Sequence, residues 1–307
     1  MKILIELPTW LGDTIMATPA IENIVNFDND VQITFIGSFV AVEVMKNHPK
    51  VVKTVVLDKK YRVLYKIARN LGEFDYFFSF RSSLRTKFLK FLISAKNKYQ
   101  FDKNKYQHRH QVEKYNDFIN DSLDINFPPG KLLLSTISSQ SSTQKTVGIN
   151  PGASYGSAKR WYPEEFAKVA SELSDRYDIV IFGGPGEVDI ALDIEKLLIK
   201  KDVKNYKNLA GKTTIPELIN HISNLDLFIT GDSGPMHVAA AFQIPTVAIF
   251  GPTKDNETSQ WMNEKSIIVK KGLDCQPCMQ RACPLQHHNC MKLITSVEVL
   301  DAVNGID

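Results

Sequence analysis

The chain has 307 residues, a length that suits two domains of ordinary size or one large domain. Apolar residues make up 43% of the sequence, which is enough for packed cores and excludes a disordered protein. The formal net charge is only +3, so the overall charge gives no indication of a nucleic-acid-binding protein.

The N-terminal stretch, MKILIELPTW, is a short apolar run that Glu6 and Pro8 interrupt. It is too short for the core of a signal peptide and lacks a cleavage site. No window of the sequence approaches the run of about 20 apolar residues that a membrane span needs. We therefore expect a cytoplasmic protein.

The N-terminal half alternates predicted strands with predicted helices. Apolar runs predict strands over residues 1–7, 31–37, 51–57 and 74–80. Helical spacing of apolar residues predicts helices over residues 12–27, 39–47, 61–71, 83–93 and 112–123. Strands that alternate with helices are typical of βαβ units and predict a parallel sheet.

A basic stretch lies between Arg85 and Lys114. Its basic side chains are Arg85, Lys87, Lys90, Lys96, Lys98, Lys103, Lys105, Arg109 and Lys114, with His108 and His110. Only Asp102 and Glu113 oppose them. Such a stretch predicts a surface for phosphate groups or for a membrane, and a solvated helix face is the alternative.

Composition changes over residues 127–145, where two prolines, a glycine and a Ser/Thr/Gln cluster predict a linker. We expect one domain over residues 1–140 and a second over residues 145–307. The alternation of strands and helices then restarts. Strands are predicted within residues 146–152, 178–187, 225–234 and 245–253, and helices within residues 162–177 and 214–225.

An apolar run in the second half stops at Gly-Asp-Ser-Gly-Pro, residues 231–235, where a helix of small residues is predicted to begin. Pro235 suits the first turn of a helix, where its missing N–H costs nothing. Ligands of open α/β sheets bind beyond the carboxyl ends of the strands. The backbone N–H groups of Ser233 and Gly234 at this helix start therefore predict an anion site.

The sequence also suggests roles for two side chains beside this turn. His237, about one turn into the helix, can donate a hydrogen bond to a phosphate oxygen. Asp232 would repel a phosphate, so we expect it to cap the helix or to orient Ser233 and His237. A well-capped helix after a conventional turn is the alternative to an anion site.

A second strand-end loop, residues 150–161, also has the residue types of an anion site. Gly152 and Gly156 permit close approach of the backbone, Ser154 offers a hydroxyl and Lys159 offers a positive charge. Two such loops in one domain predict a diphosphate site, and a flexible surface loop is the alternative. The glycine-rich turn within residues 182–189 is not the G-x-G-x-x-G fingerprint, and the sequence contains no Walker A motif.

Two acidic residues are candidates for contacts with a sugar. Glu187 follows a glycine-rich turn within residues 182–189, where an acid can accept a ribose hydroxyl. Asp13 follows the first strand at the predicted N-cap of the first helix. A carboxylate there can accept a proton from a sugar hydroxyl, although the helix start lowers its pKa; a plain N-cap aspartate is the alternative.

All the cysteines fall within 16 residues, with His287 and His288 among them. They are Cys275, Cys278, Cys283 and Cys290, spaced C-x2-C-x4-C-x6-C. In a cytoplasmic protein such a cluster resembles a structural zinc site more than a set of disulfides. Because the spacing is not that of a standard zinc finger, reduced or redox-sensitive thiols are the alternative.

Four segments together resemble glycosyltransferase family 9, the bacterial ADP-heptose:lipopolysaccharide heptosyltransferases. The segments are LPTWLGD, NPGASYGSAKRW, GDSGPMHVAAA with PTVAIFGPT, and CQPCMQRACPLQHHNCM. The cysteine-rich segment is most similar to the heptosyltransferase II branch. The resemblance implies an α/β fold of the GT-B class, in which two Rossmann-like parallel-sheet domains face each other across a cleft.

The resemblance also implies an activity and roles for individual residues. The activity is an inverting, metal-independent transfer of heptose from ADP-heptose to the heptose of the lipopolysaccharide inner core, with no cofactor required. By motif match Asp13 takes the position of the general base, and Lys159 that of the lysine on the donor diphosphate. Ser154 matches a phosphate contact and Glu187 the contact to the nucleoside. The residues matching the phosphate-binding turn are Asp232, Ser233, Gly234 and His237.

The acceptor implied by the resemblance is a heptose-bearing Kdo2-lipid A at the cytoplasmic surface of the inner membrane, where the protein is expected to associate peripherally. Arg81 and Arg85 are the predicted acceptor-binding residues. Three alternatives stay open: a heptosyltransferase I, a related transferase for another nucleotide sugar, and a non-catalytic nucleotide-binding protein of the same fold. Asp13 favours an enzyme.

Overall fold

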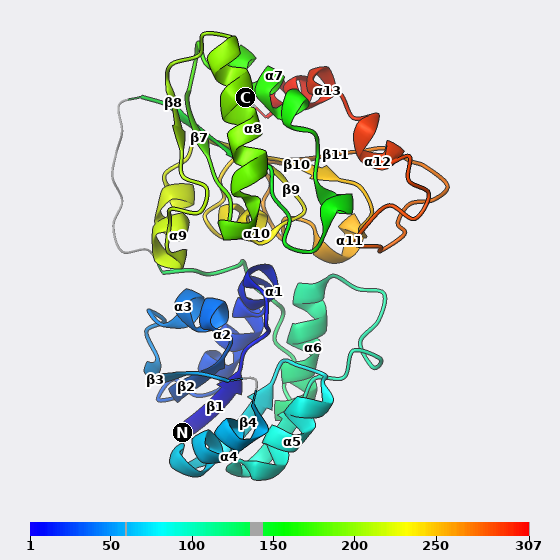
Figure 1. The fold of residues 1–307 in the computed structure, drawn as a ribbon. Coiled ribbons are helices and arrows are strands. Elements are labelled where there is room, and N and C mark those ends of the chain that lie inside the picture. Colours follow the sequence, from blue (N-terminus) through cyan, green and yellow to red (C-terminus); the bar gives the residue numbers. More distant parts are fainter. Residues whose placement is uncertain (59, 136–143, 307) are drawn as a thin grey trace. The chain divides into compact units, whose positions relative to one another are not determined.

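The computed structural model describes residues 1–58, 60–135 and 144–306. The chain divides into two compact units, unit 1 (Met1–Ser135) and unit 2 (Thr136–Asp307), each with a sheet of its own (Figure 1). The predicted linker, residues 127–145, falls across this division, and its residues 136–143 lie outside the described residues.

Unit 1 contains a parallel sheet of five strands in the order β3-β2-β1-β4-β5. The strands are β1 (Lys2–Glu6), β2 (Gln32–Gly37), β3 (Val51–Val56), β4 (Glu73–Ser79) and β5 (Ser94–Gln100). The helices are α1 (Leu11–Met16), α2 (Thr18–Phe27), α3 (Phe39–Met45), α4 (Tyr61–Asn70), α5 (Leu84–Leu92) and α6 (Gln111–Leu123). The four predicted strands are confirmed. The prediction missed β5 because its sequence, SAKNKYQ, has no apolar run.

The predicted helix over residues 12–27 is in fact two helices, α1 and α2, that meet at Ala17. Pro19 lies in the first turn of α2, and its missing N–H cannot continue the hydrogen-bond ladder of α1. The apolar spacing runs through both helices, so periodicity alone does not reveal the break.

Helices cover both faces of the unit 1 sheet. Helices α4 and α5 pack against each other, and their buried residues Leu64 and Leu89 join Leu4 and Phe77 of the sheet in one core cluster. Strand side chains of the opposite parity point to the other face, where the ring of Phe78 meets Phe118 of α6. Figure 1 shows α4 and α5 beside each other.

Unit 2 contains a parallel sheet of six strands in the order β11-β10-β9-β6-β7-β8. The strands are β6 (Thr146–Asn150), β7 (Asp178–Ile181), β8 (Tyr206–Asn208), β9 (Leu227–Gly231), β10 (Thr246–Phe250) and β11 (Ser266–Lys270). The helices are η1 (Ser157–Lys159), α7 (Pro163–Leu173), η2 (Pro185–Glu187), α8 (Val188–Lys200), α9 (Ile215–Ser223), α10 (Gly234–Ala241), α11 (Asp255–Thr258), α12 (Asn289–Lys292) and α13 (Ser296–Asn304). The predicted strands and helices of this half are confirmed, whereas β8, β11 and the helices α8 and α11 to α13 were not predicted.

The main core of unit 2 lies between the sheet and three helices. Side chains of β6, β7, β9 and β10 with one parity, such as Ile149 and Ile229, pack against Phe166 of α7, Ile194 of α8 and Val299 of α13. Helices α9 and α10 contact each other, and Met236 of α10 packs against the opposite parity of β10. The sheet is therefore covered on both faces, as a parallel sheet requires.

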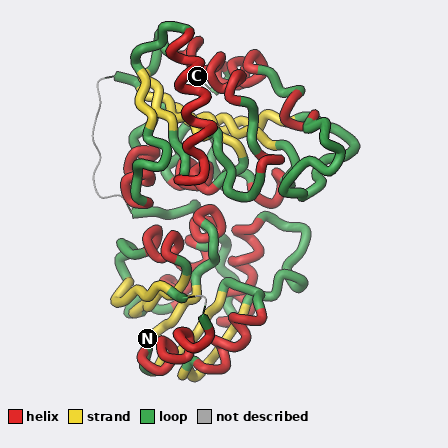
Figure 2. The backbone as a smooth tube through the Cα atoms, viewed as in Figure 1, coloured by secondary structure: helices red, strands yellow, loops and turns green. Residues whose placement is uncertain are grey.

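A long segment without helix or strand, residues 271–288, leads from β11 to α12. It is orange to red in Figure 1 and forms a green loop at the side of unit 2 in Figure 2. It carries three of the cysteines, and the fourth, Cys290, lies in α12. In the described part of the chain no helix combines the length and apolar character that a membrane crossing needs.

Candidate functional site

Three neighbouring strands of unit 2, β6, β9 and β10, end at the same edge of the sheet. The loops after β6 and β9 carry the residues predicted to hold a diphosphate. The side chain of Asn150 at the end of β6 donates hydrogen bonds to Ser233 Oγ at 3.2 Å and to Thr230 Oγ1 at 3.3 Å. The loops after β6 and β9 are thus tied together, as the strand-end rule predicts.

Lys159 and Asp232 form an ion pair at this edge. The Lys159 Nζ lies 2.6 Å from Asp232 Oδ2 and also donates to the Asp232 carbonyl at 3.2 Å. Thr253 Oγ1, from the loop after β10, donates to the same carboxylate oxygen at 2.6 Å. The side chains of Lys159 and Asp232 are only 13% and 6% exposed. The negative charge of Asp232 is therefore compensated within the protein.

The prediction that Asp232 caps the following helix is wrong. The N-cap of α10 is Ser233, and its side chain makes no cap hydrogen bond. The Ser233 hydroxyl is held instead by Asn150 and by Thr230 Oγ1 at 3.0 Å. Because the side chain of Ser233 leaves the first backbone N–H groups of α10 uncapped, an anion could accept from them, and the anion site at Ser233 and Gly234 stays a prediction.

The other predicted donor residues of unit 2 lie around this helix start. His237 is buried on the first turn of α10, and Ser154 is exposed in the loop after β6. The ring of Tyr155 lies 4.9 Å from the Lys159 Nζ and 5.5 Å from the guanidinium carbon of Arg281. Sequence reasoning missed Thr253, Tyr155 and Arg281. All three stand in motifs that carry the family resemblance, which is the signal that could have found them.

Glu187 lies against the loop after β6. The carboxylate accepts a hydrogen bond from the Gly184 N–H at 2.7 Å, and the residue is buried. A Cβ atom added to Gly152 would lie 2.1 Å from the Glu187 carboxyl carbon. The glycine at position 152 therefore makes room for this carboxylate beside the diphosphate loops, and its contact to a nucleoside stays a prediction.

The prediction that Asp13 of unit 1 is the N-cap of the first helix is wrong. The N-cap is Trp10, whose backbone is extended, so Asp13 is the third residue of α1 and lies in its first turn. The N–H groups of that turn favour a negative charge. Tyr115 of α6 is near enough to sense Asp13: burial raises the pKa of Tyr115 well above its usual value, and the charge of Asp13 raises it further.

The two predicted acceptor residues, Arg81 and Arg85, lie near a buried acid that the sequence analysis noticed only as a break in an apolar run. Glu6, at the end of β1, has no exposed surface. It accepts a hydrogen bond from Ser79 Oγ at 2.6 Å and pairs with Arg81 at 3.5 Å. Burial raises the pKa of Glu6, although Ser79 and both arginines act in the opposite direction.

The basic surface is smaller than the stretch from Arg85 to Lys114 predicts. Lys114 is buried. Lys96 pairs with Asp75, Lys105 with Asp121, and Arg109 with Glu113 and Asp117. Asp75 belongs to β4, and the other three acids belong to α6. A count of basic residues along the chain could not reveal which of them these acids pair with.

The basic side chains of α5 instead join those of α4 in a surface that we name the α4–α5 face. Its exposed residues are Tyr61, Arg62, Tyr65, Lys66, Arg69, Leu84, Lys87, Phe88 and Phe91. Leu84 and Phe91 are 78% and 81% exposed. Neither helix contains an acidic residue. The face therefore combines large apolar side chains with positive charge that neither of the two packed helices compensates.

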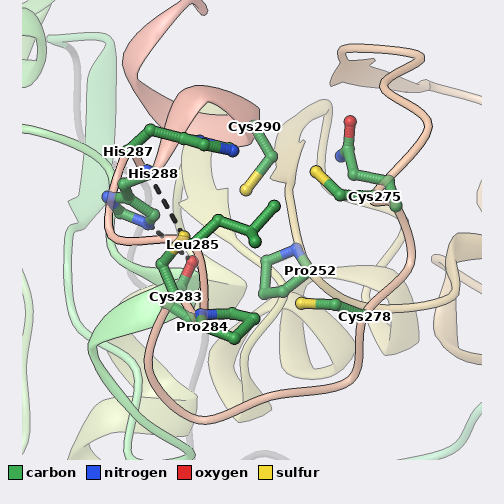
Figure 3. Close-up of a pocket in the computed structure, with 11 residues that line it drawn as sticks. Pro252, Cys275, Cys278, Cys283, Pro284, Leu285, His287, His288 and Cys290 are labelled. Carbon is green, nitrogen blue, oxygen red and sulfur yellow. Dashed lines mark hydrogen bonds between the residues drawn. The ribbon is translucent and has the colours of Figure 1, made fainter.

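The cysteine cluster surrounds a small cavity in unit 2. Cys275, Cys278, Cys283 and Cys290 all line it, and none is in a disulfide. Figure 3 shows the sulfur atoms directed toward this cavity from the loop and from α12. Burial and the neighbouring sulfur atoms raise the pKa of Cys290 to about 11. As the described side chains stand, no three potential ligands are close enough to hold a metal ion.

Comparisons with known proteins agree with this architecture. The model of glycosyltransferase family 9 (heptosyltransferase) matches residues 79–289. The lipooligosaccharide heptosyltransferase 2 of Campylobacter jejuni is 44% identical, and the alignment covers 100% of this chain and 98% of that protein.

Two solved structures share the fold. The E. coli ADP-heptose LPS heptosyltransferase II superposes with a TM-score of 0.84 at 21% identity, over 100% of this chain and 98% of that one. The E. coli heptosyltransferase WaaC with ADP-2-deoxy-2-fluoro heptose superposes with a TM-score of 0.80 at 13% identity, over 100% of both chains. The expected α/β fold of the GT-B class is confirmed. The chain belongs to glycosyltransferase family 9, the heptosyltransferases.

Proposed function

We propose that the chain is an inverting heptosyltransferase that moves L-glycero-D-manno-heptose from ADP-heptose to the heptose of the lipopolysaccharide inner core. The observation that carries this proposal is the start of α10, where the N-cap Ser233 makes no side-chain cap hydrogen bond and Lys159 pairs with Asp232 of the same turn. Backbone N–H groups at a helix start and a nearby ammonium can together bind the phosphates of a nucleotide. Two features of the relatives select the sugar and the acceptor: the full-length similarity to a lipooligosaccharide heptosyltransferase 2, and the fold shared with an ADP-heptose-dependent enzyme.

The donor side of the reaction needs compensation of charge. When the bond between the anomeric carbon and the diphosphate oxygen breaks, ADP leaves with an additional negative charge. The N–H groups at the start of α10 and the Lys159 ammonium can stabilise that charge as it develops. The exposed Ser154 hydroxyl and the turn from Asp232 to His237 complete the predicted diphosphate contacts. This scheme needs no metal ion.

The acceptor side needs a base. As the acceptor oxygen attacks the anomeric carbon from the face opposite the leaving diphosphate, its proton must be removed, and we assign that task to Asp13. The N–H groups of the first turn of α1 favour a negative charge on Asp13, and the ionised carboxylate is the form that accepts a proton.

The acceptor is a lipid in a membrane, so the protein has to reach a membrane surface. The α4–α5 face offers exposed aromatic and aliphatic side chains, such as Phe91 and Leu84, together with Lys87 and other cations. Interfacial proteins bind anionic lipids with this combination. We therefore place the protein peripherally at the cytoplasmic surface of the inner membrane, with Arg81 and Arg85 contacting the phosphorylated acceptor.

The test is a transfer assay monitored by mass spectrometry. The protein is incubated with ADP-heptose and Kdo2-lipid A that bears one heptose, and we expect the product to gain one heptose. Kdo2-lipid A without heptose and UDP-sugars are the controls. Transfer to the heptose-free acceptor would instead indicate a heptosyltransferase I, and transfer from a UDP-sugar would indicate a different donor. Binding of ADP without any transfer would support a non-catalytic nucleotide-binding protein.

A further inference from the structure

We propose that Cys275, Cys278, Cys283 and Cys290 bind one zinc ion, and that this site holds the loop of residues 271–288 against the donor loop after β6. The role of the donor loop rests on the proposed function, whereas the metal site does not.

The first argument is the convergence of all the thiols of the chain on one cavity. The cavity is about 20 Å³ in volume, which is room for one group of the size of a water molecule. Pro252, Pro284 and Leu285 form much of the remaining wall. In Figure 3 the sulfur atoms approach this wall from several directions, with Leu285 and Pro252 between them.

The chemistry of the lining favours a soft cation. Beside the four thiols and the apolar side chains, Gln276, His287 and His288 line the cavity. Thiolate sulfur binds zinc with four tetrahedral ligands at about 2.3 Å. The pair Cys275 and Cys278 has the C-x2-C spacing that structural zinc sites commonly use.

The hydrogen bonds of His288 exclude it from the ligand set, and we assign the four ligands to the cysteines. Both ring nitrogens of His288 are engaged, Nδ1 with the Tyr162 hydroxyl at 3.1 Å and Nε2 with the Ala158 carbonyl at 2.9 Å. His287 Nδ1 accepts the backbone N–H of Asn289 at 2.9 Å. The backbone N–H of His288 donates to Cys283 Sγ at 3.4 Å, which is the kind of bond that orients a metal-bound thiolate.

Binding requires the sulfur atoms to move closer together than they stand, because no three of the described potential ligands meet ligand geometry. Zinc binding therefore requires rotations of the cysteine side chains and small shifts of residues 271–288 that bring three sulfur atoms toward Cys290. Cys290 is buried in α12, so we expect it to keep its place while the other three cysteines approach it.

The loop that the cluster would stabilise is bonded directly to the donor loop. Ala158 N–H donates to the Arg281 carbonyl at 3.0 Å, and the Tyr155 hydroxyl donates to the Met279 carbonyl at 2.7 Å. The Met279 N–H in turn donates to the Pro252 carbonyl at 2.8 Å. A bound zinc ion would therefore fix the backbone that positions Lys159, without contacting the substrate.

The test begins with metal content. The full chain, without a histidine tag, is produced in zinc-supplemented medium, purified under reducing conditions and analysed by mass spectrometry for metals. We expect about one zinc ion per chain. Cys278→Ser and Cys283→Ser should each lose most of the metal, and His287→Ala should retain it. Retention of full zinc content by both cysteine variants would overturn the assignment.

A second measurement uses the unaltered chain, so it does not depend on the folding of a variant. A thiol reagent should modify the four cysteines slowly in the zinc-loaded protein and quickly after treatment with a chelator. Cobalt added to the chelated protein should give the charge-transfer absorption of cobalt–sulfur bonds. A chain that purifies without zinc, and whose thiols react equally fast with and without added zinc, would refute the metal site.

The coupling to the donor loop has its own readout. Calorimetry with ADP should show affinity that is severalfold weaker after zinc removal and is restored when zinc is added back. An equal ADP affinity in both forms would exclude the support of the donor loop. Metal content and thiol protection are measured without substrate, so their failure is distinguishable from a failure of the proposed heptosyl transfer.

Discussion

The ammonium of Lys159 lies 2.6 Å from Oδ2 of Asp232, and both side chains are largely shielded from solvent. A basic residue predicted to hold a diphosphate is thus already neutralised by an acid of the neighbouring loop. Thr253 and the pair form one network across three strand ends. A nucleotide that binds here competes with Asp232 for the ammonium of Lys159. The negative charge of Asp232 therefore reduces the attraction between Lys159 and a phosphate.

The first prediction concerns this pair. Lys159→Ala should weaken ADP binding more than the loss of one contact explains, because it leaves the Asp232 charge exposed to the diphosphate. Removing one partner of a buried pair also destabilises a protein by about 3–5 kcal/mol, so a lowered melting temperature is expected. Calorimetric titration with ADP measures the binding and thermal unfolding measures the stability.

The double variant Lys159→Ala/Asp232→Asn separates attraction from repulsion. It should bind ADP more tightly than Lys159→Ala alone, since the uncompensated carboxylate is gone, and it should recover part of the lost stability. A coupling free energy near zero in this double-mutant cycle would show that the two side chains act independently on the nucleotide.

The second prediction concerns Gly152. A Cβ atom at this position would lie 2.1 Å from the Glu187 carboxyl carbon, so Gly152→Ala forces Glu187 or its loop to move. Overpacking of this kind costs about 1–3 kcal/mol of stability. We also expect weaker ADP binding, because Glu187 is the predicted nucleoside contact.

Gly186 provides the matched control, since no described atom lies within 4 Å of a Cβ atom added there. Gly186→Ala should leave both the melting temperature and the ADP affinity close to those of the parent chain. If Gly152→Ala lowers stability but leaves ADP affinity unchanged, Glu187 has only a structural role.

The third prediction concerns the base. Asp13→Asn should lower kcat by about 10²–10⁴-fold, the usual contribution of a general base, and should leave ADP affinity largely unchanged. The control is Asp30→Asn, which neutralises an exposed carboxylate of the same unit. Turnover by Asp13→Asn at the rate of the parent chain would remove Asp13 from the mechanism.

The fourth prediction is a dependence of stability on pH. Burial raises the pKa of Glu6 above its usual value near 4.5, so the folded protein binds more protons than the unfolded chain between those two values. Stability therefore falls as the pH rises through this window. Glu6→Gln keeps a hydrogen-bond acceptor for Ser79 and Arg81 but has no charge to bury.

The melting temperature of Glu6→Gln relative to the parent chain should thus be higher at neutral pH than at pH 4. Glu43→Gln, which changes an acid paired with Lys46 on the surface of α3, should show a difference of less than about 0.5 kcal/mol in stability. If the melting temperature of Glu6→Gln relative to the parent chain fell with rising pH, the expected direction of the effect would be contradicted.

The sequence predicts those parts of the fold and the site that local pattern determines. The buried strands, such as β1 and β9, are continuous apolar runs, and the helix start at Ser233 follows from Gly-Asp-Ser-Gly-Pro. The edge strand β5 is polar and half-buried, and its place is decided by pairing with β4, which no local pattern expresses.

Pairings between distant segments likewise escape sequence reasoning. The motifs contain both Lys159 and Asp232, but their ion pair exists only because β6 and β9 are neighbours in the sheet. In the sequence, Glu6 only interrupts an apolar strand. In the structure, Ser79 of β4 and Arg81 of the following loop lie beside Glu6 and bond to its carboxylate. The N-cap prediction for Asp13 is wrong because the boundary at Trp10 has no capping side chain to mark it.

The fifth prediction concerns membrane association. Because the α4–α5 face carries exposed Phe91 and Lys87 and neither helix contains an acid, Phe91→Asp/Lys87→Glu should weaken binding to vesicles that contain anionic lipid. A basic residue near such a surface contributes about 1 kcal/mol, and the buried aromatic ring adds to it, so a loss of at least about tenfold is expected. Cosedimentation with vesicles measures the binding, and the same vesicles without anionic lipid should bind the parent chain weakly.

Phe39→Asp, which changes an exposed aromatic residue of α3 in the same unit, is the control and should bind as the parent chain does. Equal losses for Phe39→Asp and for the double variant would show that the α4–α5 face has no special part in docking.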